Sequence, residues 1–306
     1  MRVRVLGSAA GGGFPQWNCA CPNCEGVRHQ RIPARARTQE SVAVSADGVG
    51  WFLLNASPEI RAQIESFAPL QPREPRSTPV AGIVLTNGDL DHCLGLLSLR
   101  ESQPLVIYAT ETVRRGFVQG NALYATLERF PGQVTWHPLV PGRTQTLTLP
   151  DGGASGLTLE PIAVPGQPPL HLRAQLVPSA EDNVGLLLRD LATGGTLSYL
   201  SGVAAMSTAV RAAVAGSHCV FFDGTFWSSD ELIALGLGER RAEDMAHWPI
   251  GGATGSLRGL AELARGRRIF IHVNNTNPIL REDSAERGQI SASGWEVAYD
   301  GLELAI

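Results

Sequence analysis

The sequence predicts an α/β protein in which two mixed β-sheets are flanked by helices, in one domain that spans residues 1–306. Some neighbouring apolar runs of strand length are separated only by a turn, which is typical of antiparallel hairpins, and others by a helix, which is typical of parallel strands. The second half of the chain repeats this order. Hydrophobic residues make up 43% of the chain and charged residues 18%, as expected for a protein with a folded core.

Five strands are predicted in the first half of the chain: Arg2–Leu6, Ser41–Ala46, Trp51–Asn55, Val80–Leu85 and Leu105–Ala109. The second and third form a predicted hairpin, because Asp47-Gly48 between them is a preferred turn sequence. The first strand runs into Gly7–Gly13, a loop whose glycines permit close approach of the backbone. A short helix is predicted after the hairpin, with Ser57 as N-cap and Pro58 at the first helical position. Further helical segments follow the last strand as far as about Phe130.

Six strands are predicted in the second half: Leu157–Val164, Val184–Arg189, Thr196–Leu200, Cys219–Phe222, Ile269–Ile271 and Glu296–Leu304. The glycine-containing stretch 192–195 joins two of them in a hairpin. Met206–Ala215 is a predicted helix, and so is Ser256–Ala264, whose apolar residues recur on one face. We expect Glu296–Leu304 to close a sheet.

Composition also excludes several classes of protein. The net charge is −4, and no basic cluster suggests a nucleic-acid-binding surface. The longest apolar runs are of strand length, far short of the about 20 residues that a membrane-spanning helix needs. The N-terminal segment lacks the longer apolar core of a signal peptide. We therefore expect a cytoplasmic protein that binds neither nucleic acid nor a membrane.

Three of the five cysteines, Cys19, Cys21 and Cys24, lie within six residues of one another. Three thiolates at this spacing can share one ion, and zinc suits them because structural zinc sites are closed tetrahedra of sulfur and nitrogen ligands. The fourth ligand must come from elsewhere. His29, Asn275, water and a residue of a partner chain are the alternatives, and the last of these would make the protein a homodimer.

A second candidate metal site lies where two predicted strands end. Asp91 and His92 follow the apolar run Val80–Leu85, just before a predicted helix start at Cys93, and His272 follows Ile269–Ile271. Two histidines and one carboxylate leave positions free for water, substrate or dioxygen, as catalytic sites require. The alternative is that Asp91 caps the following helix and that His92 is an ordinary core histidine. We call these three residues the open site.

Other polar residues near these strand ends are candidates for catalysis. Asp89 supplies a fourth oxygen ligand or lies just outside the ligands, and Asn87 can hydrogen-bond a metal-bound water. Asp223 follows the very apolar strand Cys219–Phe222, and His247 precedes a glycine-rich turn. Each can act as a base, an acid or a substrate contact. The alternative for both is an ordinary residue of a turn.

Three longer segments resemble the family of pyrroloquinoline quinone (PQQ) biosynthesis protein B, PqqB. They are Leu6–Cys19, Thr86–His92 and His272–Leu280, and the resemblance extends over nearly the whole chain. It implies the αββα sandwich of the metallo-β-lactamase superfamily. It also implies a structural zinc at the cysteine motif, which the family shares with the phosphonate-pathway phosphodiesterases of the superfamily.

The departures from the wider superfamily are informative. Thr86–His92 is similar to the superfamily motif His-x-His-x-Asp-His, but Asn87 and Asp89 stand in place of its first two histidines. The bridging aspartate of the superfamily falls near Gly202. The resemblance therefore implies that the first metal position has lost most of its donors and that only the open site remains. A two-metal hydrolase is accordingly disfavoured.

The resemblance also implies a function. It places the chain in the synthesis of PQQ from a Glu–Tyr unit of a precursor peptide, a route that adds oxygen to the tyrosine ring. Because two histidines and one carboxylate are the ligands of non-haem Fe(II) oxygenases, we expect an iron- and O₂-dependent hydroxylase of the cross-linked Glu–Tyr intermediate. The alternatives are a single-metal hydrolase of the precursor peptide and a non-catalytic carrier that binds PQQ for transport. The same ligands accept Zn, Mn and Cu, so the native metal stays open.

Overall fold

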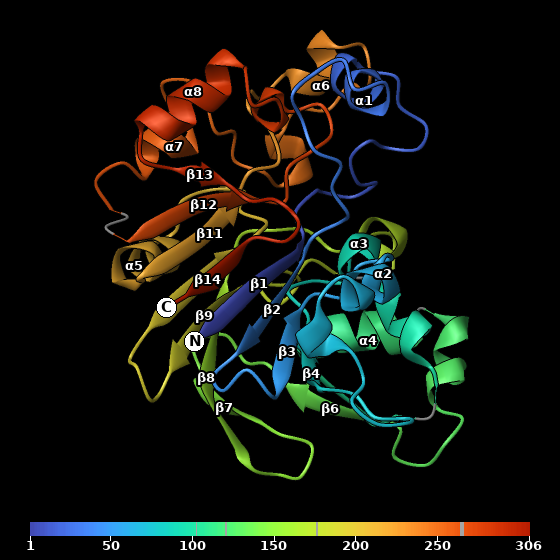
Figure 1. Ribbon diagram of the computed structural model, residues 1–306. Helices are drawn as coiled ribbons and strands as arrows, with labels where there is room; N and C mark the ends of the chain where they lie inside the picture. Colours follow the sequence, from blue (N-terminus) through green and yellow to red (C-terminus); the bar gives the residue numbers. More distant parts are fainter. Residues whose placement is uncertain (102, 120, 176, 264–265) are drawn as a thin grey trace.

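Two mixed β-sheets face each other, and helices cover the outer face of each (Figure 1). The structure is a computed structural model that describes residues 1–101, 103–119, 121–175, 177–263 and 266–306. The strand order is β14-β1-β2-β3-β4-β5-β6 in the first sheet and β13-β12-β11-β10-β9-β8-β7 in the second. In both sheets the earlier strands pair antiparallel and the later strands pair parallel, except that the last strand, β14, pairs antiparallel with β1. The predicted αββα sandwich is confirmed.

The first sheet contains β1 (Arg2–Gly7), β2 (Ser41–Ser45), β3 (Trp51–Leu54), β4 (Val80–Val84), β5 (Leu105–Ala109), β6 (Val134–Pro138) and β14 (Glu303–Ala305). The second contains β7 (Gln145–Thr148), β8 (Ala154–Ala163), β9 (Val184–Asp190), β10 (Thr196–Leu200), β11 (Cys219–Asp223), β12 (Arg267–Ile271) and β13 (Glu296–Val297). The α-helices are α1 (Pro22–Arg28), α2 (Ile60–Glu65), α3 (Leu90–Cys93), α4 (Glu111–Gln119), α5 (Thr208–Gly216), α6 (Glu231–Ala234), α7 (Ser256–Gly259) and α8 (Ala285–Ala292). Short 3₁₀ helices include Leu94–Leu99, Ala122–Leu127 and Leu170–Leu172.

The alternation of side chains along the buried strands explains the layers. Along β11, Phe221 contributes to the core between the two sheets, whereas Val220 and Phe222 pack on the opposite face, under the helices. Successive residues of a strand point to opposite faces, so a strand that is apolar throughout must be covered on both sides. A third cluster, which includes Ile83 and Phe117, fills the space between the first sheet and its helices.

The C-terminal part of the chain differs from the prediction of one strand over Glu296–Leu304. The structure divides it into β13, which pairs with β12 in the second sheet, and β14, which pairs with β1 in the first. Between them Gly301 adopts a φ of 100°, which favours glycine, and the chain crosses from one sheet to the other. Asp300 fixes this crossing, because its carboxylate accepts hydrogen bonds from Ser8 Oγ at 2.8 Å and Thr38 N at 2.6 Å.

Two predicted helix features are wrong. Ser57 is not an N-cap: α2 begins at Ile60, and the buried Ser57 hydroxyl has no hydrogen-bond partner among the described residues. The predicted helix Ser256–Ala264 ends as an α-helix at Gly259, which lies against the Trp248 ring where a Cβ would clash. Ala264 lies outside the described residues.

Two strands were not predicted from the sequence. Both β6 and β7 are edge strands, and most of their residues are at least partly exposed. Such strands need few apolar residues, so their hydrophobic pattern is weak. None of the helices in the described parts of the chain has the length and hydrophobicity needed to cross a bilayer.

The two sheets bring four strand ends together at one edge of the sandwich. Residues 85–92 follow β4, Gly202 follows β10, Asp223 ends β11, and His272 follows β12. The carboxyl ends of parallel strands point the same way, and α/β proteins commonly bind ligands there. This edge holds the predicted open site.

Candidate metal centre

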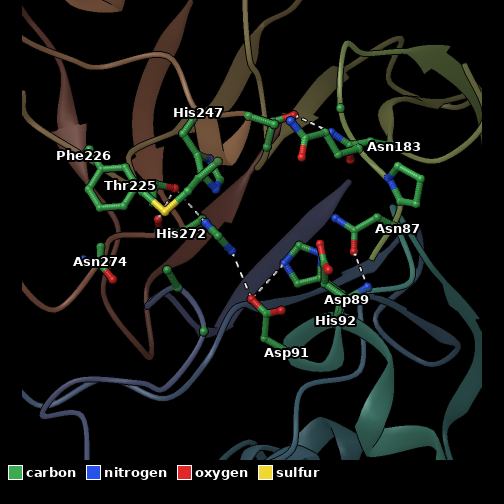
Figure 2. A pocket seen from close by; sticks show the side chains of 18 of the residues that line it. Asn87, Asp89, Asp91, His92, Asn183, Thr225, Phe226, His247, His272 and Asn274 are labelled. Atoms are coloured by element: carbon green, nitrogen blue, oxygen red, sulfur yellow. Dashed lines mark hydrogen bonds and ion pairs between the residues drawn. The ribbon is translucent and has the colours of Figure 1, made fainter. Parts of the chain in front are cut away.

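A cavity of about 240 Å³ opens at this edge of the sandwich (Figure 2). Of the predicted site residues, Asn87, Asp89, Asp91, His92, His247 and His272 line it. Asp223 is fully buried behind the cavity wall and contacts His247. Residues 87–92, His247 and His272 lie far apart in the sequence and therefore come together around one cavity.

The three residues of the open site point their donor atoms at one another. Asp91 Oδ2 lies 3.2 Å from His272 Nε2 and 3.6 Å from His92 Nε2, and the three ligand atoms all lie within 4.8 Å of one another. Two atoms that each bind one ion at about 2.1 Å, with an angle of roughly 90–120° between the bonds, are about 3.0–3.6 Å apart. The spacing therefore suits a single metal ion.

The hydrogen bonds of His92 leave its Nε2 free to bind a metal. Its Nδ1 lies 3.1 Å from Thr86 Oγ1, and the Thr86 hydroxyl donates its own proton to Asn55 Oδ1 at 3.0 Å. Thr86 must therefore accept from His92 Nδ1–H, which leaves the Nε2 lone pair bare. This atom is buried and has no hydrogen-bond partner among the described residues.

His272 is held in the same way. Its Nδ1 lies 2.8 Å from Thr225 Oγ1, and Thr225 donates its proton to Asp223 Oδ1 at 2.6 Å. Thr225 thus accepts from His272 Nδ1–H, and Nε2 faces Asp91. The backbone of His272 has a φ of 59°, a left-handed conformation that is uncommon outside glycine and is found preferentially at functional sites.

A third histidine, His247, is held by Asp223. His247 Nδ1 lies 2.7 Å from Asp223 Oδ2, and its ring stacks on that of His272 with 5.5 Å between centroids. Asp223 also accepts from Val203 N at 2.8 Å and Thr225 N at 3.0 Å. With four hydrogen bonds accepted, the Asp223 carboxylate orients His247. The ligand atoms of Asp223, His247 and His272 also lie within 4.8 Å of one another. In metal sites, histidine ligands commonly donate the proton of the second ring nitrogen to a neighbour in this way.

Charge in the open site is shared between Asp91 and the histidines. Burial disfavours the charged form of each, but the neighbouring His92 and His272 hold the pKa of Asp91 below its usual range. Burial alone would lower the pKa of His272. The hydrogen bond to Asp91 and its charge outweigh this effect and raise the pKa of His272 to about 9. Burial lowers the pKa of His92 to about 4. Without a metal, a proton on His272 therefore balances Asp91. The unpaired His92 nitrogen, the anchored tautomers and the donor spacing together fit one divalent ion.

The position of the superfamily's other metal has few donors. Asp89 lines the cavity, and burial and the charge of Asp91 raise its pKa to about 6. Asn87 Oδ1 accepts from Asp89 N at 3.0 Å. Gly202 carries no carboxylate, and Asn183 donates to its carbonyl at 2.9 Å, so that an amide occupies the space beside it.

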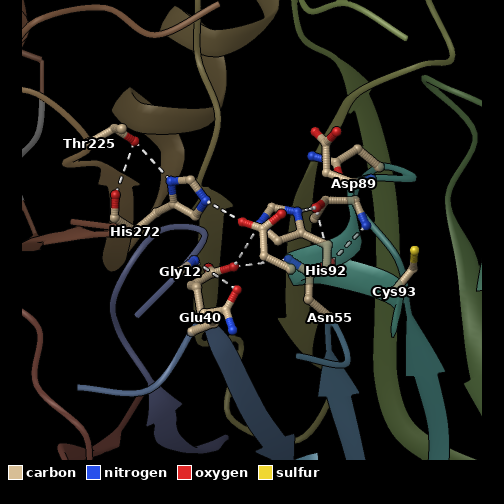
Figure 3. Close-up of polar contacts among 12 residues, drawn as sticks. Gly12, Glu40, Asn55, Asp89, His92, Cys93, Thr225 and His272 are labelled. Carbon is tan, nitrogen blue, oxygen red and sulfur yellow. Dashed lines mark hydrogen bonds and ion pairs between the residues drawn. The ribbon is translucent and has the colours of Figure 1, made fainter. Parts of the chain in front are cut away.

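Sequence reasoning missed two buried residues beneath the open site (Figure 3). Glu40 precedes β2 and is fully buried, and its Oε2 lies 3.5 Å from His92 Nε2. Burial raises the pKa of Glu40 to about 7. Asn55, which follows β3, donates to Glu40 at 3.0 Å and accepts from Thr86. The available signal was a glutamate at the start of an apolar strand and an asparagine at the end of another.

The three cysteines converge at a separate place. Cys19, Cys21 and Cys24 have their sulfur atoms within 4.8 Å of one another, at the start of α1. The amide of Asn275 points at all three, with Nδ2 at 3.3 Å from the sulfurs of Cys19 and Cys24. Turning this amide by 180° presents its oxygen to the same point. Of the proposed fourth ligands, His29 is instead exposed at the end of α1.

Comparisons with known proteins identify the family and agree with the fold. A family model of the beta-lactamase superfamily domain matches residues 50–273. Coenzyme PQQ synthesis protein B of Azotobacter vinelandii is 44% identical over 99% of both chains, and that of Pseudomonas fluorescens (strain Pf0-1) is 42% identical over 100% of both. The crystal structure of Zn²⁺-bound PqqB from Methylobacterium extorquens has a TM-score of 0.92, with 40% identity and 100% coverage of both chains. A diphosphatase from the PhnP family, at 21% identity and a TM-score of 0.67 over 100% of this chain and 97% of that one, shares the fold.

Proposed function

The chain belongs to the coenzyme PQQ synthesis protein B family of the metallo-β-lactamase superfamily and has a role in PQQ biosynthesis, in which we propose that it is a metal-dependent oxygenase. The proposed reaction is hydroxylation of the tyrosine ring of a cross-linked Glu–Tyr intermediate, with Fe(II), O₂ and a two-electron reductant. One oxygen atom enters the ring and the other leaves as water.

One observation carries the proposal: Asp91, His92 and His272 form a set of two histidines and one carboxylate at the floor of a cavity. Non-haem Fe(II) oxygenases use such a set, in which the bound iron activates dioxygen while positions remain open for substrate. The threonines behind His92 and His272 fix both rings with Nε2 toward the ion. Such support commonly changes metal affinity or activity by about 10–100-fold.

His247 is the proposed proton-transfer residue. It lines the cavity beside His272, and its contact with the buried Asp223 keeps a proton on Nδ1 and leaves Nε2 as the acceptor. A base in this position can take the proton of a phenol or of a bound water. Asp223 then acts by orienting His247. We therefore assign Asp223 as a positioning residue rather than as a group that touches substrate.

The remaining cavity residues suggest how substrate is bound. Arg173 is the one arginine among the described residues that line the cavity. A guanidinium binds carboxylates in a forked geometry, which suits the amino-acid carboxylates of a Glu–Tyr product. A cavity of about 240 Å³ is also ample for one aromatic ring, since a cavity of about 150 Å³ binds benzene.

The cysteine cluster is the proposed site of a structural zinc. Cys19, Cys21 and Cys24 would supply three ligands, and Asn275 would complete the tetrahedron through its amide oxygen. Because α1 and the segment after β12 then share one ion, the zinc would fasten the N-terminal loop to the segment that carries His272. This assignment requires no partner subunit, so a homodimer is not needed to complete the site.

Anaerobic reconstitution with Fe(II), followed by incubation with a reductant and the cross-linked Glu–Tyr substrate, with and without O₂, tests the function. We expect O₂ uptake and a product that is one oxygen atom heavier, only when iron and O₂ are both present. Turnover with zinc and without O₂ would instead indicate a single-metal hydrolase. Tight binding of PQQ without any turnover, and without need of the open-site metal, would indicate a carrier.

A further inference from the structure

Glu40 occupies an unusual position directly beneath the open site (Figure 3). It is 0% exposed, and it lies outside the set of residues that line the cavity. One carboxylate oxygen, Oε2, accepts from Asn55 Nδ2 at 3.0 Å. The other, Oε1, is buried and has no hydrogen-bond partner among the described residues. A buried carboxylate in this state is costly unless a proton or a cation accompanies it.

The Glu40 carboxylate faces two groups, the hydroxyl of Tyr199 and the metal-binding edge of His92. Glu40 Oε2 lies 3.5 Å from His92 Nε2, the same buried atom that lacks a hydrogen-bond partner. This separation matches the 3.6 Å between His92 Nε2 and Asp91 Oδ2, and it falls within the about 3.0–3.6 Å expected for two ligands of one ion. In the described chain, the ion pairs of Glu40 are limited to this histidine.

We infer that Glu40 is a fourth protein ligand of the open-site metal, which it approaches from the protein side, opposite the cavity. This inference rests on the proposed metal-dependent function. Glu40 is not among the three residues whose ligand atoms lie within 4.8 Å of one another, so its carboxylate must turn toward the ion. Oε1 accepts no hydrogen bond that would oppose this turn, and Oε2 would exchange its hydrogen bond from Asn55 for the ion.

A fourth ligand changes the chemistry of the centre. Two carboxylates neutralise the charge of a divalent ion, whereas Asp91 alone leaves it positive. The set becomes two histidines and two carboxylates, with one fewer position open to substrate and O₂. Oxygen ligands also favour iron and manganese over softer ions.

The test is a titration of protein that keeps its zinc at the cysteine cluster but has an empty open site. Fe(II) or Co(II) is added anaerobically against a competing chelator, and Co(II) absorption in the visible range reports the ligand field. Glu40→Gln keeps an oxygen that can accept from Asn55 and removes the charge. Glu231→Gln is the matched control, because Glu231 is also buried but contacts Thr276 and Trp227 rather than the open site. Asp91→Ala is the blank.

We expect Glu40→Gln to bind Fe(II) at least about tenfold more weakly than wild type and to show a changed Co(II) spectrum, with Glu231→Gln like wild type. Wild-type affinity and spectrum in Glu40→Gln, with no binding in Asp91→Ala, would overturn the inference and leave the proposed function standing. Equal binding by wild type and Asp91→Ala would overturn both. If Glu40→Gln does not fold, Glu40→Asp replaces it: a shortened carboxylate must also weaken binding and alter the spectrum.

Discussion

Replacing Asp223 with asparagine keeps the shape of the side chain and removes its charge, which tests the proposed link between a buried carboxylate and His247. Asp223 Oδ1 accepts from Thr225 N and Oγ1, and Oδ2 accepts from Val203 N and His247 Nδ1. Asparagine offers one accepting oxygen and one donating nitrogen. Whichever way it is turned, two of these four donors face an NH₂ group.

The expected cost follows from these contacts. Thr225 Oγ1 can turn to another acceptor and His247 can change tautomer, but one backbone N–H, of Val203 or of Thr225, stays buried without a partner. Such a group costs about 1–3 kcal/mol, and exchanging the charge-assisted hydrogen bond to His247 for a neutral one costs about 1 kcal/mol more. The sum predicts a decrease of about 2–4 kcal/mol in the free energy of unfolding, measured by urea denaturation at pH 7.

The control is His247→Ala. His247 is half-buried at the cavity, where water can replace its contact with Asp223, so we expect a loss of at most about 1.5 kcal/mol. Both variants should lose activity, by about 10²–10⁴-fold if His247 transfers a proton. A stability change below about 1 kcal/mol in Asp223→Asn, or full activity in either variant, would refute this account of the pair.

Four further predictions concern the two metal sites. Cys21→Ser should lose zinc and lower the thermal stability, and unchanged zinc content would contradict the structural assignment. Asp91→Ala and His272→Ala should each abolish metal binding at the open site. Neither should unfold the protein, because both residues follow strands and lie outside the core. Metal analysis measures the binding and circular dichroism measures the fold. Below its pKa of about 9, His272 holds a proton that the metal must displace. The affinity for Fe(II) should therefore rise between about pH 6.5 and 8.5, by up to about tenfold per pH unit. An affinity that does not change with pH would contradict His272 as a ligand. Asn87→His with Asp89→His should raise binding of a second metal only weakly, and two tight equivalents would reveal an unrecognised donor.

The site residues that could be predicted from the sequence lie at the ends of buried strands. Asp91, His92 and His272 follow apolar strands, and the ends of parallel strands meet at one edge of a sheet, so that local sequence and topology together bring them close. His247 was a weaker prediction, because it lies on a loop whose path depends on packing. The structure brings it against His272, and the two rings stack.

The parts that escaped prediction depend on contacts across the fold. Glu40 and Asn55 belong to a hairpin that appeared purely structural, and their role is visible only when β3 pairs with β4 and places Asn55 against Thr86. Similarly, nothing near the three cysteines selects Asn275, which is about 250 positions away in the chain. The division of Glu296–Leu304 between two sheets also depends on distant partners such as Thr38.

The crossing of the chain at Asp300 and Gly301 affects how the protein is made. β14 pairs with β1, so Arg2 lies opposite Ala305, although about 300 residues separate them. A ribosome that adds about 5–20 residues per second therefore exposes one edge of β1 for at least about 15 seconds before its partner emerges. During that interval the open edge can pair with other nascent strands. Arg2 and Arg4 alternate with valines on β1, and their charges would discourage such pairing until Glu303 arrives to meet Arg4.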